Sequence, residues 1–349
     1  MLRITEAQNI EPCRLDHLEH LTAIVPLDLE FRAKDILAKV RLMVELCHGS
    51  SLKIVFAHND RKTAADAQLK QSLRDINNVS LVSGKFYEGT VNSGLLRNIA
   101  FEAVHTEHLV LLDVDLWLDL NILSKYLAKI IKNEESFTII PCLYLSEAGS
   151  RSLVSREKST NLLKEQYFSF SRKEFLHLAN PSSIVILRSD DYKILNGFDV
   201  TFAGHGYEDF DFLLRLAVLR SKISPALDFF ENATMRAPLF AQGFRREIGR
   251  FCLTPLLEKD FFLHIFHQKP NESALYYSLR QKNYLYFCEK HKAFVDGERP
   301  VDPTLMTDFI NLCSSTERRV QDYSIYFENK PGHVDRYDTF RKRLKFLFK

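Results

Sequence analysis

The first third of the chain alternates short apolar runs with longer amphipathic stretches, and this alternation constrains the fold more than any other feature. The short runs are rich in β-branched and aliphatic residues, and the stretches between them carry apolar residues at helical spacing. Strands are expected at 21–27, 53–57, 79–82 and 109–112, and helices at 32–47, 66–76 and 95–104. Strands separated by helices predict an α/β fold, Rossmann-like, with a mostly parallel central sheet and helices on both faces. Ligands of such sheets bind at the carboxyl ends of the strands.

The pattern becomes less regular from about Leu120 onward. Residues 137–141 have the composition of a further strand, and 146–171 is polar and is expected to form a mobile loop. A chain of 349 residues fits one enlarged α/β domain with an extension. We therefore predict a first domain at 1–272 and a helical C-terminal extension at 273–349.

Composition excludes several classes of protein. The formal net charge is only +2, so no overall field favours nucleic acid as a partner. Six cysteines are scattered singly, without a CxxC pair, which argues against a zinc site or a disulfide framework. No apolar secretory segment opens the chain, and no run of about 18 apolar residues could span a bilayer. We expect a cytoplasmic protein that can associate peripherally with the inner face of the cell membrane.

Two carboxylates, Asp113 and Asp115, directly follow the strand predicted at 109–112. Short acidic strings are common in solvated turns, which is the simplest explanation for this one. At the end of a buried strand, however, both side chains can face one crevice. Hard oxygen ligands hold a divalent cation, and that cation can bridge the phosphates of a nucleotide diphosphate and neutralise their charge.

A second acidic segment lies at 196–216. Gly204 and Gly206 bracket His205, and Glu208, Asp209 and Asp211 then lead into an apolar helical run. Acids in the first turn of a helix are stabilised by its dipole, so a capped helix explains part of the pattern. It does not explain two glycines immediately before the acids. The functional interpretation is that one carboxylate is a general base and its neighbour orients the acceptor.

Together these segments resemble the β-1,4-galactosyltransferases and the chondroitin-synthase group of N-acetylgalactosaminyltransferases. Those enzymes have the GT-A fold, a DVD metal motif and a GWGGED-type acceptor motif. The resemblance extends in the same order over residues 20–272, through 23–32, 91–104, 109–118, 194–216 and 264–271. It implies a GT-A fold for this chain.

The resemblance also implies the donor side of a site. Asp115 would be the principal ligand of Mn²⁺ (or Mg²⁺), with Asp113 nearer the ribose and also counted as a metal-site residue. His267 would supply an imidazole ligand, and His264, three residues earlier, is the alternative. A polar residue among aromatics is the simpler explanation for both histidines. Pro26 and Arg32 would lie against the nucleotide.

On the acceptor side, the resemblance makes Asp209 the catalytic base and Glu208 its acceptor-orienting partner. His205, Gly206, Tyr207 and Asp211 would also bind the acceptor. His205 stands where the family has tryptophan, and Tyr207 stands where it has glycine.

The donor segment departs from the family as well. The arginine of the family's NRA-type segment is replaced by Ser93, and Arg97 one turn later is expected to bind the donor instead. This departure and those of the acceptor motif leave the sugar specificity open.

The expected function is an inverting, Mn²⁺-dependent glycosyltransferase that moves a sugar from a UDP-sugar to a glycan acceptor in bacterial capsule or other surface polysaccharide synthesis. The alternatives are a retaining transferase on the same fold, a non-catalytic glycan-binding subunit of a polymerase complex, and a nucleotidyltransferase. The last would need a phosphate-binding loop rich in glycine and lysine near the N-terminus. Residues 336–349 form a basic amphipathic pattern that fits either a helix on anionic lipid or an ordinary docked helix.

Overall fold

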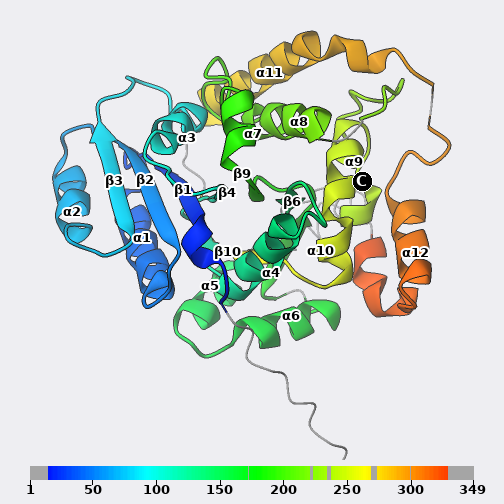
Figure 1. Cartoon of the computed structure of the whole chain (residues 1–349), viewed down its shortest axis with the longest axis horizontal. Helices are drawn as coiled ribbons and strands as arrows, with labels where there is room; N and C mark the ends of the chain where they lie inside the picture. Colours follow the sequence, from blue (N-terminus) through cyan, green and yellow to red (C-terminus); the bar gives the residue numbers. More distant parts are fainter. Residues whose placement is uncertain are drawn as a thin grey trace, which may run out of the picture.

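A central six-stranded sheet organises the computed structural model, which describes residues 15–171, 173–220, 223–233, 237–268, 273–298 and 300–328 (Figure 1). Its strand order is β3-β2-β1-β4-β9-β6. The first four are parallel, and β9 is antiparallel to both of its neighbours. The strands are β1 (Leu21–Leu27), β2 (Lys53–Asn59), β3 (Val79–Gly84), β4 (His108–Leu111), β6 (Thr138–Ile139) and β9 (Val185–Arg188).

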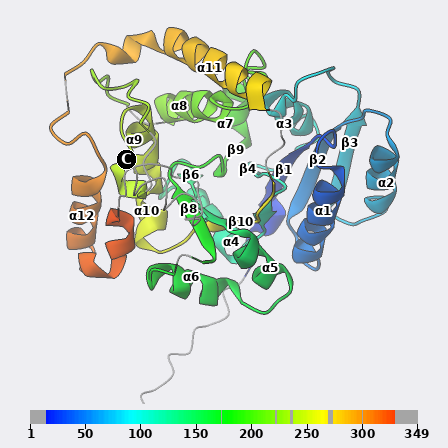
Figure 2. The same ribbon diagram turned by 180° about the vertical axis from the view of Figure 1, so that it is seen from behind.

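Helices cover both faces of this sheet (Figures 1 and 2). One face carries α1 (Ala33–Cys47), α2 (Ala64–Ser72) and α4 (Leu120–Ile131), and the other carries α3 (Ser93–Phe101), α7 (Ser189–Ile194) and α8 (Glu208–Arg220). Successive strand residues point to opposite faces, so Ala23 and Val25 join the core under α1 and α4, whereas Ile24 joins the core under α3 and α8. Burial on both faces explains why the strands are apolar throughout.

A smaller sheet, ordered β5-β10-β7-β8, lies beside the first and has its own apolar core. Its strands are β5 (Leu116–Trp117), β7 (Cys142–Leu145), β8 (Phe175–Ala179) and β10 (Phe262–His264). The helices of this core are α5 (Glu147–Val154), α6 (Thr160–Phe168), α10 (Leu253–Leu257) and α12 (Met306–Ser315), whereas α9 (Phe244–Gly249) packs into the core that α8 lines. Short 3₁₀ segments are η1 (Leu18–His20), η2 (Pro238–Phe240), η3 (Arg250–Cys252), η4 (Lys292–Val295) and η5 (Val320–Phe327).

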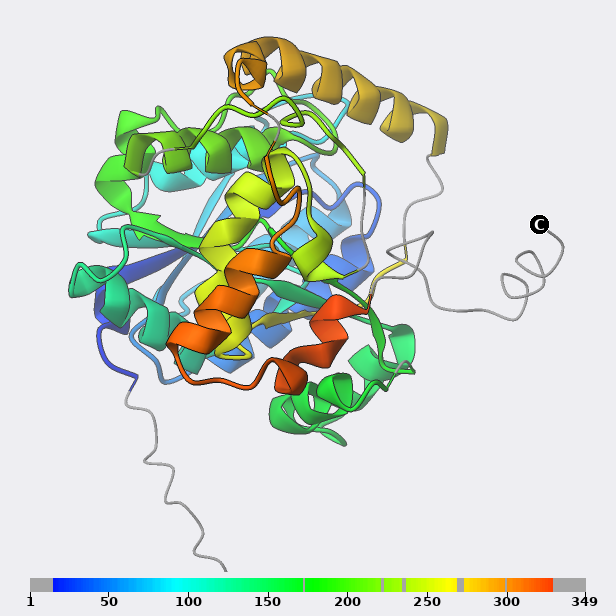
Figure 3. The ribbon, with the colours of Figure 1, turned by 90° about the vertical axis from the view of Figure 1, so that its right-hand side faces the viewer.

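The helix α11 (Ser273–Lys290) runs across α8 (Figures 1 and 3). Phe287 is fully buried in the core that α8 also lines, and the His291 imidazole lies 2.9 Å from the Asp211 carboxylate. Residues beyond position 272 therefore pack directly on the sheet-bearing part of the chain. The division at 272 stays a prediction.

The strands and helices expected in the first third are confirmed, with small shifts at their ends. One prediction for the middle of the chain was wrong. Residues 146–171 contain α5 and α6, each begun by a serine, Ser146 and Ser159, whose hydroxyl accepts from the backbone of the first turn. The segment after Leu120 begins a helix, α4. Within the described part of the chain, no helix combines the length and apolar character that a membrane span requires, and 336–349 lies outside that part.

Candidate active site

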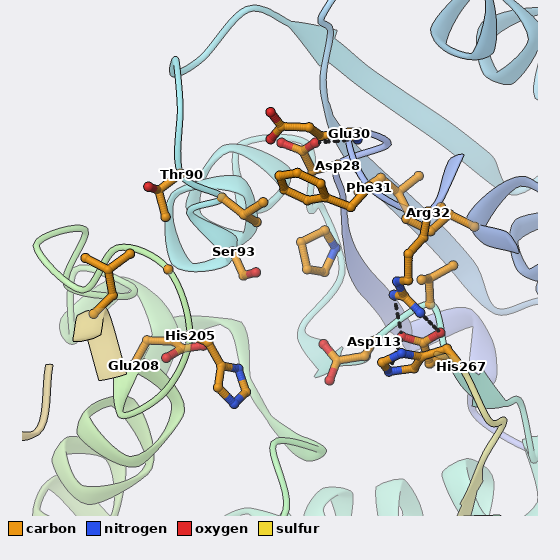
Figure 4. A pocket seen from close by; sticks show the side chains of 18 of the residues that line it. Asp28, Glu30, Phe31, Arg32, Thr90, Ser93, Asp113, His205, Glu208 and His267 are labelled. Atoms are coloured by element: carbon orange, nitrogen blue, oxygen red, sulfur yellow. Dashed lines mark hydrogen bonds and ion pairs between the residues drawn. The ribbon is translucent and has the colours of Figure 1, made fainter. Parts of the chain in front are cut away.

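A cleft of about 530 Å³ opens at the carboxyl ends of β1 and β4 (Figure 4). The strand order reverses between β1 and β4, because β2 and β3 lie on one side of β1 and β4 lies on the other. Open α/β sheets bind their ligands at such a reversal. The residues that line the cleft are Pro26, Leu27, Asp28, Glu30, Phe31, Arg32, Ile36, Gly89, Thr90, Val91, Ser93, Asp113, Val114, Asp115, Gly204, His205, Glu208, His267 and Leu279. Figure 4 shows His205 and Glu208 on one side, and Asp113, Arg32 and His267 on the other.

Asp115 lies where the chain leaves β4 and enters β5, and its carboxylate is held by two cations. Arg32 donates to both oxygens at 3.1 and 3.0 Å, and the Lys39 ammonium donates to Oδ1 at 2.6 Å. Burial alone would raise the pKa of Asp115, but the hydrogen bonds from Arg32 and the charge of Lys39 lower it well below its usual range. Asp115 is therefore an ionised, oriented carboxylate.

Two histidines complete a cluster with Asp115. One donor atom from each of Asp115, His264 and His267 lies within 4.8 Å of the other two. Burial lowers the pKa of both imidazoles, that of His264 to about 3, so both are neutral, which is the form that binds metal. His264 is held by stacking on Tyr144, with ring centroids 4.0 Å apart. The donor set of one carboxylate and two imidazoles fits a divalent transition-metal ion.

Arg97 joins the two acidic motifs. Its guanidinium donates to Asp113 at 2.8 Å and to Asp209 at 2.8 Å, and the side chain is 2% exposed. The Ser183 hydroxyl donates to the other oxygen of Asp113 at 3.1 Å. Arg97 itself does not line the cleft, whereas its partner Asp113 does, so the donor-binding role expected for Arg97 stays a prediction.

Glu208 and Asp209 share one buried environment but differ in their partners. Burial, and then the neighbouring Asp209, raises the pKa of Glu208 to about 8. Burial also raises the pKa of Asp209, but Arg97 opposes that rise. At neutral pH Glu208 therefore keeps its proton, whereas the charge of Arg97 favours the ionised form of Asp209.

The acceptor turn, residues 204–208, depends on left-handed backbone. Gly204, Gly206 and Tyr207 have φ values of 80°, 97° and 75°. Glycine adopts this conformation without strain, which explains both glycines. His205 lines the cleft, whereas Tyr207 lies beneath the turn with its ring packed among aromatic side chains.

Asp211 does not face the acceptor as expected, and this prediction is corrected. Its carboxylate is fully buried and pairs with Arg215, Lys290 and His291 at 2.8–2.9 Å. Asp211 therefore joins α8 to the end of α11. The position of Asp211 in the first turn of α8 is compatible with acceptor binding and with a structural ion pair, so the sequence could not distinguish these two roles.

Two residues of the site were not predicted from the sequence, Asp28, which lines the cleft, and Lys39, which contacts Asp115. Asp28, directly after β1, accepts from the Tyr87 hydroxyl at 2.7 Å and from Arg61 at 2.9 and 3.0 Å. An acid at the end of a strand was a usable signal, as it was for Asp113. Lys39 gave none, because it lies on the buried face of α1 among apolar residues.

Several solved structures are similar in part. A mutant of Drosophila β1,4-galactosyltransferase 7, in complex with manganese, UDP-Gal and xylobiose, is 18% identical with a TM-score of 0.31. The match covers 56% of this chain and 59% of that one, so this chain spans less than two thirds of its length. Staphylococcus aureus TarS with UDP-GlcNAc is 12% identical over 94% and 78% of the two chains, with a TM-score of 0.41.

A mannosyltransferase from Pyrobaculum calidifontis, in complex with GDP-Man and Mn²⁺, is 13% identical over 88% and 84% of the two chains, with a TM-score of 0.36. No curated protein matches the sequence.

A family model gives the decisive comparison. The model described as glycosyltransferase like family 2 matches residues 49–293, which is more than half of the chain. The match includes both acidic motifs and the histidine pair, and it agrees with the GT-A fold expected from the sequence. The protein is accordingly a glycosyltransferase by family, and the chain belongs to the glycosyltransferase-like family 2.

Proposed function

We propose that this protein is an inverting, Mn²⁺-dependent transferase that moves a sugar from a UDP-sugar to a hydroxyl of a glycan, in the synthesis of a bacterial capsule or other surface polysaccharide. The observation that carries the proposal is that one cleft is lined both by Asp115 and His267 of the aspartate–histidine cluster and by Glu208 of the acidic pair, with Asp209 next to Glu208 in the chain. The first suits the donor diphosphate and the second suits the acceptor hydroxyl.

On the donor side, Asp115, His264 and His267 would hold the ion, Mn²⁺ or Mg²⁺. A bound ion of this kind neutralises the charge that builds up on the departing diphosphate. Arg32 and Lys39 fix the carboxylate of Asp115 in place. We place the nucleoside at the end of the cleft where Asp28 and Pro26 lie, with Asp113 toward the ribose.

On the acceptor side, Asp209 would take the proton of the attacking hydroxyl. A positioned carboxylate contributes roughly 10²–10⁴-fold to such a step. Protonated Glu208 would donate a hydrogen bond to the acceptor and so orient it, because its carboxyl group lines the cleft. One carboxylate base opposite the leaving group suits a single displacement, which inverts the anomeric centre.

The experiment is a panel of UDP-sugars incubated with the protein in Mn²⁺ or in EDTA, with UDP release as the readout. Asp115→Ala tests the metal cluster, and Asp119→Ala, which removes the N-cap of α4, is the matched carboxylate control. Mn²⁺-dependent release that only Asp115→Ala abolishes supports the proposal. Sugar binding without release would favour the non-catalytic subunit, and a product of retained configuration would favour the retaining mechanism.

We further propose peripheral membrane association through residues 336–349, on the basic amphipathic pattern of that sequence. Co-sedimentation with vesicles that contain anionic lipid tests this. Binding that persists after deletion of 336–349, or that does not depend on anionic lipid, would contradict it.

A further inference from the structure

Three arginines are buried in the described part of the chain, and one of them differs from the others. Arg97 pairs with two aspartates, and Arg246 pairs with Asp228 and Glu247 at 2.7 and 2.9 Å. Arg245 is only 9% exposed, yet no carboxylate of the described residues lies within ion-pair distance of it. Buried charges are costly unless they are paired, so an unpaired guanidinium calls for an explanation.

Neutral groups hold Arg245 in one orientation. Its guanidinium stacks on Phe210 and Phe244, 4.9 and 4.6 Å from the ring centroids, and it donates to the amide oxygen of Asn232. The Tyr207 hydroxyl is a further hydrogen-bond partner. These contacts fix the direction of the guanidinium but leave its charge uncompensated.

A second arginine lies close by. Arg280, on α11, places its guanidinium 5.4 Å from the centroid of the Tyr207 ring, and a Cβ atom on Gly206 would lie 3.0 Å from its Nη1. It too has no carboxylate partner among the described residues. Burial lowers the pKa of Arg245, and the charge of Arg280 acts in the same direction. Two like charges around one tyrosine repel each other unless an anion lies between or beside them.

There is room for such a group beside Arg245. Arg245 lines a cavity of about 120 Å³ whose walls include Ala233, Ala237 and Ala241. A water molecule takes about 30 Å³ in the liquid, so the space suits a carboxylate or a phosphate group. Asn180 also lines this cavity, and its buried Oδ1 has no hydrogen-bond partner in the described structure, so it can accept from a hydroxyl.

We propose that Arg245 and Arg280 form an anion subsite beside the acceptor turn, and that the acceptor is an acidic glycan whose carboxylate or phosphate group lies close to the hydroxyl that receives the sugar. Both arginines surround Tyr207, the residue that precedes Glu208, so the subsite adjoins the proposed acceptor position. This inference rests on the function proposed above.

The test is calorimetric binding of methyl glycosides to the whole protein in the presence of UDP and Mn²⁺. Methyl glucoside and methyl galactoside are each compared with their uronic acid and their 6-phosphate, so that the two anionic groups are separated. We expect at least one acidic form to bind about tenfold tighter than its neutral parent, as charge-assisted hydrogen bonds predict. Arg280→Gln should remove that preference without weakening the neutral parent, and exposed Arg151→Gln should leave it unchanged.

Arg245→Met adds a readout that does not depend on turnover. Because the charge is unpaired, its removal should raise the melting temperature while it weakens binding of the acidic glycoside. The proposal is overturned if no acidic form is preferred, if Arg280→Gln weakens both forms equally, or if Arg245→Met lowers the melting temperature. UDP release without acceptor is measured in parallel. Release without an acidic preference refutes only the subsite, and an acidic preference without release refutes only the proposed transferase.

Discussion

Arg97 bridges two carboxylates that the proposed reaction uses for different purposes. Asp113 lies on the donor side and Asp209 on the acceptor side. A single guanidinium at 2.8 Å from both sets the spacing between the two halves of the cleft. Its charge also opposes the rise that burial causes in the pKa of Asp209.

The first prediction concerns this residue. Arg97→Met should lower the free energy of unfolding by about 2 kcal/mol, toward the small end for a broken buried pair because both aspartates are partly exposed. It should also abolish UDP release. Arg97→Lys keeps the positive charge but loses the two separate guanidinium nitrogens that bind the two aspartates. This variant should therefore keep more of its stability than of its UDP release. Urea unfolding measures the first effect, with exposed Arg318→Met as the control. Normal UDP release from Arg97→Met would contradict the role.

The second prediction is a pH dependence from Glu208. Its pKa is about 8 in the folded chain and 4.5 for an exposed glutamate. Between these values the folded chain binds a proton that the unfolded chain has lost, so stability falls as pH rises from about 4.5 to 8 and then levels off. Glu208→Gln should make this fall shallower and gain stability relative to the parent protein as pH rises. Unfolding midpoints between pH 5 and 9 test this, and parallel curves would refute it.

Site residues that stand in a recognisable sequence string could be predicted, whether from the string itself or from the family resemblance, and those that only packing places at the site could not. Asp113, Asp115 and Glu208 were identified because each follows a strand or opens a helix in a recognisable string. Lys39 lies 76 residues from its partner Asp115. Its position on the apolar face of a helix predicts only that the methylene groups of its side chain are buried, and not that its ammonium group has a partner. Arg245 was missed for the same reason, since its unpaired state is a property of three-dimensional packing.

At the scale of elements, the contact between α8 and the end of α11 depends on Asp211. Asp211→Ala should cost about 3 kcal/mol, because it leaves the His291 imidazole and two cations without their common partner. The substitution should speed up amide hydrogen exchange more in α11 than in the central sheet. UDP release should also fall, because Leu279 of α11 lines the cleft. Exposed Glu289→Ala is the control on the same helix. Unchanged exchange in α11 would contradict this account.

Elements with a clear period were predicted and very short ones were not. The parallel strands are buried on both faces and read as apolar runs, which identifies them without any knowledge of their neighbours. The strands β5 and β10 have two and three residues, so no period exists to detect, whereas β6 lies within the strand predicted at 137–141. In 146–171 the serines that suggested a loop are the caps of two helices, because the same hydroxyl chemistry serves turns and helix starts.

For the whole molecule, residues 305–326 close the core of the smaller sheet. Phe309 is fully buried there, and the Tyr323 hydroxyl donates to the carbonyl of Leu257 at 2.8 Å. Phe309→Ala should cost about 3–4 kcal/mol by leaving a cavity, and exposed Val301→Ala should cost almost nothing. This core contains residues from both sides of position 272. Calorimetry should therefore show a single thermal unfolding transition, and Phe309→Ala should move that whole transition to lower temperature. Two transitions, of which one moves, would instead favour an independent C-terminal domain.

The linked pair of contacts around Arg97 also limits how sequences of this kind can change. Replacement of Asp113 or Asp209 alone would leave a buried guanidinium with one partner, and replacement of Arg97 alone would leave two facing acids. Tolerated changes must therefore involve several positions at once. Among homologous sequences, positions 97, 113 and 209 should covary, and a lineage that has lost one of the three should show a compensating substitution at another.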